Sequence, residues 1–208
     1  APRGARSGAP WTTAVTLTFW RLGKVAHADA ATYMAMQMVG GLLGVMVVAT
    51  GWRGLLADPA VNFVATVPGS GGPWLAWGVE FTISFVQMSV ILYAGNAPRL
   101  ARWTGALAAA LVAANISFVA PLSGMSMNPS RTLASAVPSG VWTSIWIYLT
   151  APPLAMLLAG EFFVARRGKA GVYCAKLNHA EGVRCIFCEH QGRCAEAAST
   201  GDAVTPTR

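Results

Sequence analysis

The residues with the clearest chemical potential form a short run, Asn128-Pro129-Ser130-Arg131, that follows a long apolar stretch. Asn128 supplies an amide N–H₂ that can replace part of the water shell of a neutral solute. Arg131 supplies a guanidinium that stays ionised, and such a fixed cation repels protons and metal ions. Asn followed by Pro is also a helix-start signal, because Asn caps free amides and Pro loses no needed N–H there. The run therefore predicts a short helix, over 129–136, whose N-terminus presents a donor and a positive charge.

The composition shows what kind of protein must position these groups. The chain has 208 residues, of which 54% are hydrophobic and only 11% charged, whereas a soluble domain has about 25% charged residues. The net charge is +7, but the basic residues form short clusters between apolar stretches, which argues against nucleic-acid binding. Between residues 30 and 160 the ionisable acids and bases are Arg53, Asp58, Glu80, Arg99, Arg102 and Arg131. This distribution predicts a membrane domain.

Four stretches are long and apolar enough to cross a bilayer, which takes about 20 helical residues. They are Ala30–Trp52, Trp74–Ala94, Trp103–Pro121 and Val141–Gly160. Basic residues cluster on one side of these spans, and the positive-inside rule makes that side cytoplasmic. The segment between the third and fourth spans is too short and polar to cross, and Pro138 and Gly140 are expected to end its helix. Half-length helices of this kind are tolerated where they line a wet cavity or are buried in protein.

The start of the chain is similar to this segment. Thr12-Thr13-Ala14 stands where the later segment has Asn128-Pro129-Ser130, and a short helical stretch and then a span follow each. The similarity predicts an inverted repeat with two half-helices. The spans Trp74–Ala94 and Trp103–Pro121 precede the second copy of this repeat, which begins at Asn128. The first copy, which begins at Thr12, has only eleven residues before it in the sequence.

The runs SGMSMNPSR and SGAPWTTAVTL resemble the two motifs of the aquaporin or major intrinsic protein family, and the resemblance covers about Ser7 to Ala165. Gly124, Met127, Asn128, Pro129 and Arg131 match the second motif, with Ser130 in place of the usual alanine. In the first motif Thr12 and Thr13 stand where Asn and Pro belong. The resemblance implies an all-α membrane protein with four full spans and two half-helices, lacking the first two transmembrane spans of the family.

The resemblance also implies a function and a set of site residues. The function is a channel for passive transport of water or small uncharged solutes, with no cofactor, embedded in lipid and assembled as a homo-oligomer, most often a tetramer. Glu80 would support the loop that holds the second motif. The pore and selectivity residues would be Asn128, Pro129, Ser130, Arg131, Met125, Ile116, Thr12, Thr13 and Ala14.

Two other functions remain open from the sequence. The chain could be a truncated family member that inserts without conducting, or a membrane anchor whose C-terminal tail binds metal or senses redox state. An enzyme is not expected, because the sequence has no Gly-rich phosphate loop, nucleophile elbow or paired membrane carboxylates. We expect an integral protein of the inner or plasma membrane, with a channel domain over 1–166 and a cytoplasmic tail over 167–208.

The tail contains all four cysteines, Cys174, Cys185, Cys188 and Cys194. Cys185 and Cys188 have the spacing that lets two sulfurs bind one tetrahedral zinc ion. Cys174 and Cys194 are the expected further ligands, with His179 and His190 as substitutes. Reduced thiols without a function and a redox switch are the alternatives to zinc.

Overall fold

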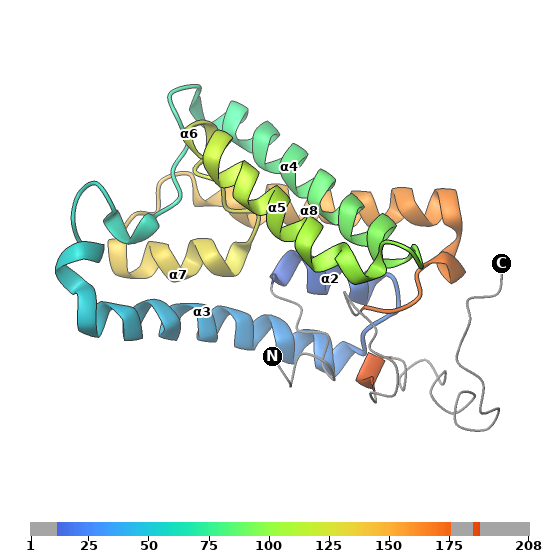
Figure 1. Ribbon diagram of the computed structural model, residues 1–208. Coiled ribbons are helices and arrows are strands. Elements are labelled where there is room, and N and C mark those ends of the chain that lie inside the picture. The colour runs from blue at the N-terminus through green and yellow to red at the C-terminus, as the bar shows by residue number, and fades with distance from the viewer. Residues whose placement is uncertain (1–11, 176–184, 188–208) are drawn as a thin grey trace.

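The computed structural model describes residues 12–175 and 185–187, and no strand occurs within those ranges. Figure 1 shows the described residues as a layered assembly of helices. The main helices are α2 (Thr13–Arg21), α3 (His27–Leu56), α4 (Gly72–Gly95), α5 (Thr104–Phe118), α6 (Ala120–Ser123), α7 (Pro129–Ser139) and α8 (Ile145–Arg167). Single turns of 3₁₀ helix occupy Asn62–Val64, Ala101–Trp103 and Lys169–Gly171.

Three of the described helices, α3, α4 and α8, are long and apolar enough to cross a membrane. The predicted third span is divided, because α5 ends at Phe118 and α6 begins at Ala120. Pro121 lies in the first turn of α6 and has no N–H with which to continue the hydrogen-bond ladder of α5. The expectation of one continuous helix over 103–121 is therefore wrong at its C-terminal end.

The other spans are longer than their apolar stretches. The last helix, α8, continues past Gly160, the predicted end of the last apolar stretch, and runs through Glu161 to Arg167. Glu161 is about half exposed and pairs with Arg21 of α2 at 3.0 Å. The part of α8 beyond its apolar stretch therefore contacts α2 at the exposed edge of the bundle.

The two half-helices, α2 and α7, lie in line between α3 on one side and α4, α5 and α8 on the other (Figure 1). α7 extends beyond the predicted end at Ala136, because Pro138 is accommodated inside its last turn. The Ser139 hydroxyl donates to the Ser135 carbonyl at 2.7 Å, and the Gly140 amide donates to the Ala136 carbonyl at 2.9 Å. Gly140 then ends the helix in the left-handed region, with φ at 70°.

Each half-helix packs closely against a glycine of a full span. A Cβ atom placed on Gly41 of α3 would lie 3.3 Å from Cβ of Ala134 in α7. A Cβ atom on Gly160 of α8 would lie 2.8 Å from Cγ2 of Thr18 in α2. Small residues let membrane helices approach closely where lipid offers no hydrophobic drive for association. The glycines thus position both half-helices.

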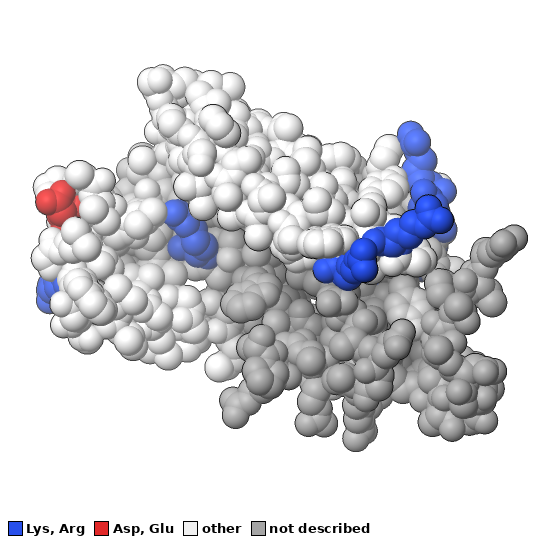
Figure 2. Space-filling model, in the orientation of Figure 1, with Lys and Arg blue, Asp and Glu red and all other residues white. Residues whose placement is uncertain are grey.

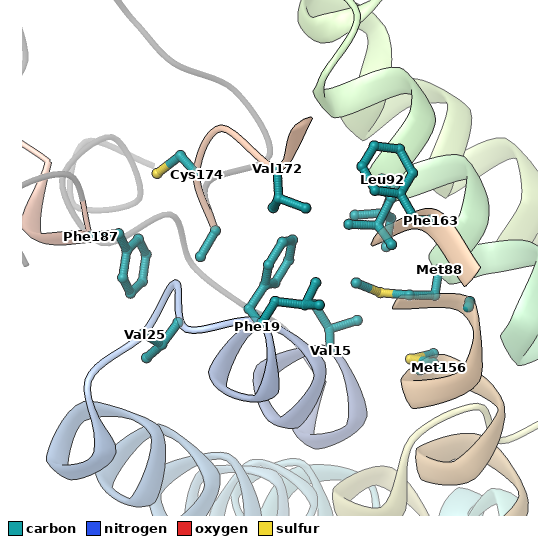
Figure 3. Packing of buried hydrophobic residues seen from close by; sticks show 14 of the residues in the cluster. Val15, Phe19, Val25, Met88, Leu92, Met156, Phe163, Val172, Cys174 and Phe187 are labelled. Atoms are coloured by element: carbon teal, nitrogen blue, oxygen red, sulfur yellow. The ribbon is translucent and has the colours of Figure 1, made fainter. Parts of the chain in front are cut away.

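The hydrophobic core lies at the end of the molecule near α2. Figure 3 shows Phe19 and Val15 of α2 among side chains of α4 and α8. Val172 and Phe187 from the segments after α8 complete this cluster. α2 is therefore held in place mainly by apolar packing.

Candidate functional site

The site begins where the N-termini of the two half-helices meet. Thr12 caps α2 by accepting a hydrogen bond from the Val15 amide, and Asn128 caps α7 by accepting one from the Ser130 amide through Oδ1. The hydroxyls of Thr13 and Ser130 hydrogen-bond to each other across the junction. Two sets of helix N-terminal amides consequently face the same place, which gives that place a positive potential.

The loop before α7 is held by a buried carboxylate. Glu80 of α4 is completely buried. Its Oε1 accepts from the Ser123 hydroxyl at 2.8 Å and from the Ser126 amide at 2.9 Å, and its Oε2 accepts from the Met127 amide at 2.9 Å. Tyr148 of α8 donates from its hydroxyl to the Ser123 carbonyl at 2.6 Å. Two spans thus hold the loop that positions Asn128.

Hydroxyl groups connect the same loop to α7. The hydroxyls of Ser126 and Thr132 are 2.5 Å apart, and Thr66 donates to Thr132 at 3.0 Å. Gly124 adopts a φ of 77°, and a Cβ atom there would lie 2.7 Å from the Val67 carbonyl oxygen. Only glycine satisfies both conditions without strain. The loop before α4 and the loop before α7 therefore form one tightly packed unit.

A cavity of about 980 Å³ opens beside this unit. Arg131 lines it and is the only ionisable residue to do so among the residues that the structure describes. The Nη1 atom of Arg131 is buried and has no hydrogen-bond partner within the described residues. Asn128 also lines the cavity, and its Nδ2 group is the part that can donate to a solute, since the helix cap uses Oδ1.

Apolar and polar residues line different sides of the cavity. α3 and the turn after it contribute mostly apolar side chains, of which Met36, Val45 and Phe63 are examples. α7 contributes polar groups from Asn128, Ser130, Arg131 and Ser135. Figure 2 shows a largely uncharged face, with most of the visible Lys and Arg side chains gathered at one end. A polar strip opposite an apolar wall can pass a small hydrated molecule while offering hydrogen bonds along one side only.

The structure brings together some of the predicted site residues and separates others. Thr13, Ala14 and Pro129 are buried around the junction. Met125 is buried in a small cluster with Ile83 and Met127, and its side chain does not line the cavity. Ile116 lies on α5 with 56% of its surface exposed, and it is not among the lining residues either. The selectivity roles of Met125 and Ile116 stay predictions.

Gln37 is a site residue that the sequence analysis missed. It lines the cavity, and its Nε2 donates to the Thr16 hydroxyl of α2 at 3.1 Å. The sequence held a signal, because Gln37 is the single side-chain amide in the uncharged stretch from Ala30 to Trp52. Polar residues inside a membrane span usually face a cavity or a partner. Ser135 had no such signal, since serine is common in short helices.

The predicted metal ligands fall only partly within the described residues. Cys174 and Cys185 are described, whereas Cys188, Cys194, His179 and His190 lie outside the described ranges. Within the described residues no group of three His, Cys, Asp or Glu side chains is placed to bind a metal ion.

Half-helices that meet by their N-termini beside a cavity, inside a bundle of apolar helices, are the arrangement that the resemblance to the major intrinsic proteins predicts. The family model of the major intrinsic proteins matches residues 3–163. The chain therefore belongs to the major intrinsic protein family. This membership confirms the predicted resemblance and the predicted all-α, aquaporin-like fold class.

Individual relatives agree with this assignment. A probable aquaporin of the NIP type from Nicotiana alata is 34% identical over 162 residues, which are 76% of this chain and 57% of the relative. The aquaporin NIP1-3 of Oryza sativa subsp. japonica is 32% identical over 150 residues, which are 72% of this chain and 51% of the relative. The chain thus spans about half the length of the curated relatives it matches.

Among solved structures, the aquaglyceroporin from Plasmodium falciparum has a similar fold. The TM-score is 0.64 at 20% sequence identity, over 76% of this chain and 72% of the aquaglyceroporin chain. At this identity the likeness concerns the fold, and it supports the arrangement of full spans around two half-helices.

Proposed function

We propose that the chain contributes a channel for water or small uncharged solutes, and that the solute passes through the cavity beside α7. The observation that supports this most directly is the location of Asn128 and Arg131 on the wall of one cavity, at the meeting point of two half-helices. Asn128 donates a hydrogen bond to the solute, and the guanidinium of Arg131 donates another and repels cations. The names of the relatives, which are aquaporins, agree with this function.

The cavity offers a direct test with a matched control on one helix. Gly44 and Gly51 both lie on α3, and a Cβ atom added to either glycine meets none of the surrounding atoms within 4 Å. Gly44 lines the cavity, whereas Gly51 does not. Vesicles that contain the purified wild-type chain should swell faster than empty vesicles after a downward osmotic step. Gly44→Trp should remove most of the added permeability, and Gly51→Trp should leave it unchanged.

Two results would contradict this function. Vesicles with the folded wild-type chain that swell no faster than empty ones would favour a non-conducting family member. Equal swelling of vesicles with Gly44→Trp and with the wild type would place the path elsewhere. Repeating the experiment with a glycerol gradient separates a water channel from one that also passes small polyols.

We also infer how the chain sits in its membrane. Arg99 and Arg102 follow the C-terminal end of α4, and Arg166 and Arg167 end α8, whose C-terminal part lies beside that of α4 through the contact of Tyr93 with Phe163. The positive-inside rule makes that end of the molecule cytoplasmic. The tail after residue 166 then lies on the cytoplasmic side of an inner or plasma membrane, with its described part packed against the ends of α2 and α4. Protease treatment of sealed vesicles of known orientation should cut this tail from the cytoplasmic side only.

The same proposal includes assembly into a homo-oligomer, for which the tetramer is the form that the family resemblance implies. α3 supports it, because Leu43 and Val47 do not line the cavity and leave 58% and 69% of their surfaces exposed. A second copy could cover part of this apolar surface, and lipid would cover the rest. Crosslinking in mild detergent should give bands above the monomer, and a monomer alone would count against assembly.

A further inference from the structure

The turn that follows α3 has an uncommon backbone. Asn62, Phe63 and Val64 have φ angles of 40°, 51° and 54°, so three consecutive residues occupy the left-handed region. Glycine enters this region freely and asparagine tolerates it, whereas phenylalanine and the β-branched valine rarely adopt it. A backbone of this kind persists only where the surrounding structure holds it, and such segments are concentrated at functional sites.

Hydrogen bonds hold the left-handed turn from both sides. On the side of α3, the Asp58 carbonyl accepts from the amides of Val61 and Asn62 at 2.9 and 2.7 Å. On the side of α4, the Thr66 hydroxyl donates to the Thr132 hydroxyl of α7 at 3.0 Å. The turn is therefore fixed between the end of α3 and the half-helix that supplies the polar groups of the cavity.

The left-handed turn lies at one end of the cavity. α3 lines the cavity from Met36 to Leu56, a distance of about 30 Å along the helix, and Phe63 lines it just beyond the end of α3. Near the start of this row, Gln37 donates to Thr16 in the first turn of α2. The turn thus lies at the end of the cavity away from the half-helix junction, where it contacts α7 (Figure 1).

This end of the cavity is apolar. Among the described residues it is lined by Leu55, Leu56, Val61, Phe63 and Val64. Phe63 is the only aromatic side chain among the described residues that line the cavity. A polyol that passes here has to leave water with each of its hydroxyl groups, and burying a hydroxyl without a hydrogen bond is costly. A single water molecule gives up fewer hydrogen bonds, so an apolar end of the cavity favours water over polyols.

We propose that Phe63 is a specificity-determining residue of this cavity, and that the left-handed turn places its ring in the path so that water passes and polyols are held back. The proposal rests on the proposed channel function, because it concerns the same cavity. It assigns the selection to the backbone as well as to the ring, since a right-handed turn over the same residues would direct the side chain elsewhere.

The first test measures two permeabilities on the same vesicles, one for water after an osmotic step and one for xylitol in a xylitol gradient. Phe63→Ala should raise the ratio of xylitol to water permeability several-fold, because the aromatic ring no longer fills the apolar end. Phe63→Leu keeps part of the apolar bulk and should give an intermediate ratio. Phe118→Ala is the matched control, because Phe118 is 79% exposed at the end of α5 and does not line the cavity. It should keep the wild-type ratio.

The second test concerns the backbone and needs no transport. Val64→Gly and Val64→Ala both remove the side chain, but only glycine takes up a left-handed φ without strain. Alanine is the more stable of the two residues in a right-handed helical turn. Val64→Gly should therefore unfold at a higher temperature than Val64→Ala. The opposite order would overturn the left-handed turn as the element that positions Phe63.

The transport results separate this proposal from the channel function. If wild-type vesicles pass water and the ratio is unchanged in Phe63→Ala and Phe63→Leu, the role of Phe63 is overturned and the channel function stands. An equal rise of the ratio in Phe118→Ala would also overturn it, because the effect would then be a general leak. Wild-type vesicles that pass no water would overturn the channel function and the selection by Phe63 together.

Discussion

The two half-helices have similar backbones and different chemistry. Both begin with a capping side chain and both pack against a glycine of a full span. α7 presents Asn128, Ser130 and Arg131 to the cavity, whereas no residue of α2 is among those that line it. α2 instead buries Ala14, with no exposed surface, in the core cluster. Of the two half-helices, α7 thus supplies polar groups to the cavity wall and α2 supplies support, and we expect α7 to be the one that meets a solute.

The two copies are also stabilised differently. The loop before α7 depends on hydrogen bonds to Glu80 and Tyr148. α2 depends on apolar contacts and on a close approach to α8 at Gly160. Substitutions that remove hydrogen bonds should therefore disturb α7 selectively, and substitutions that disturb packing should act on α2.

The largest effect is expected for Glu80→Gln. The amide N–H₂ of glutamine would face loop groups that are themselves donors, and a buried donor without an acceptor is costly. The free energy of unfolding should fall by about 3 kcal/mol. Hydrogen exchange followed by mass spectrometry should show faster exchange over 123–139 and little change over 13–21. Uniform loss of protection in both regions would contradict the division between the copies.

Glu161→Gln is the control for that experiment. Glu161 is half exposed and has an ion pair with Arg21 at 3.0 Å. Exposed ion pairs contribute about 0–1 kcal/mol. The free energy of unfolding of this variant, measured by thermal unfolding, should match that of the wild type within about 1 kcal/mol.

A smaller effect is expected for Gly160→Ala, which acts on α2. The added methyl group would meet Cγ2 of Thr18 at 2.8 Å, and such overpacking costs about 1–3 kcal/mol. Thr18→Ser removes that methyl group and keeps the hydroxyl that donates to the Ala14 carbonyl at 2.9 Å. The double variant should recover most of the stability in a thermal unfolding assay.

The matched substitution at α7 is Gly41→Ala. Its Cβ atom would lie 3.3 Å from the Ala134 Cβ, which is a milder contact. The preference of helices for Ala over Gly, about 0.5–1 kcal/mol, should offset it. A larger loss of stability for Gly41→Ala than for Gly160→Ala would show that α7 depends on packing more than α2 does.

A further expected effect concerns the contact between the two half-helices. Thr13→Val and Ser130→Ala each remove one partner of the hydrogen bond that joins the half-helices. A double-mutant cycle should give a coupling of about 1 kcal/mol between the two positions. A coupling near zero would mean that the half-helices are positioned only by their own spans.

The sequence predicts the parts of the site that depend on local rules. An Asn-Pro pair predicts the start of α7, and uncharged stretches predict the full spans. Helix ends were less predictable: α8 continues past Glu161, which pairs with Arg21 of α2. Such a pairing joins residues far apart in the chain, and no local pattern contains it.

The functional difference between the copies could be predicted only in part. Thr12 and Thr13 in place of Asn and Pro indicated that the first copy had diverged. The sequence did not show that α2 would turn its residues into the core, or that Gln37 would complete the cavity wall. The proximity of Cys174 to Cys185 was equally hidden, since it depends on how two segments pack on the bundle.

The most direct test of the account is the potassium permeability of vesicles that contain Arg131→Ala. Arg131 is the only ionisable side chain that lines the cavity among the described residues. Arg102 is the matched control, because its guanidinium lies over the ring of Trp103 at 5.6 Å and does not line the cavity. We predict that Arg131→Ala raises potassium flux by at least about tenfold, since a nearby charge contributes more than 1.4 kcal/mol, while Arg102→Ala leaves it unchanged. Potassium flux that stays at the wild-type value in Arg131→Ala, in vesicles that still pass water, would contradict the role of α7 as the copy that meets the solute.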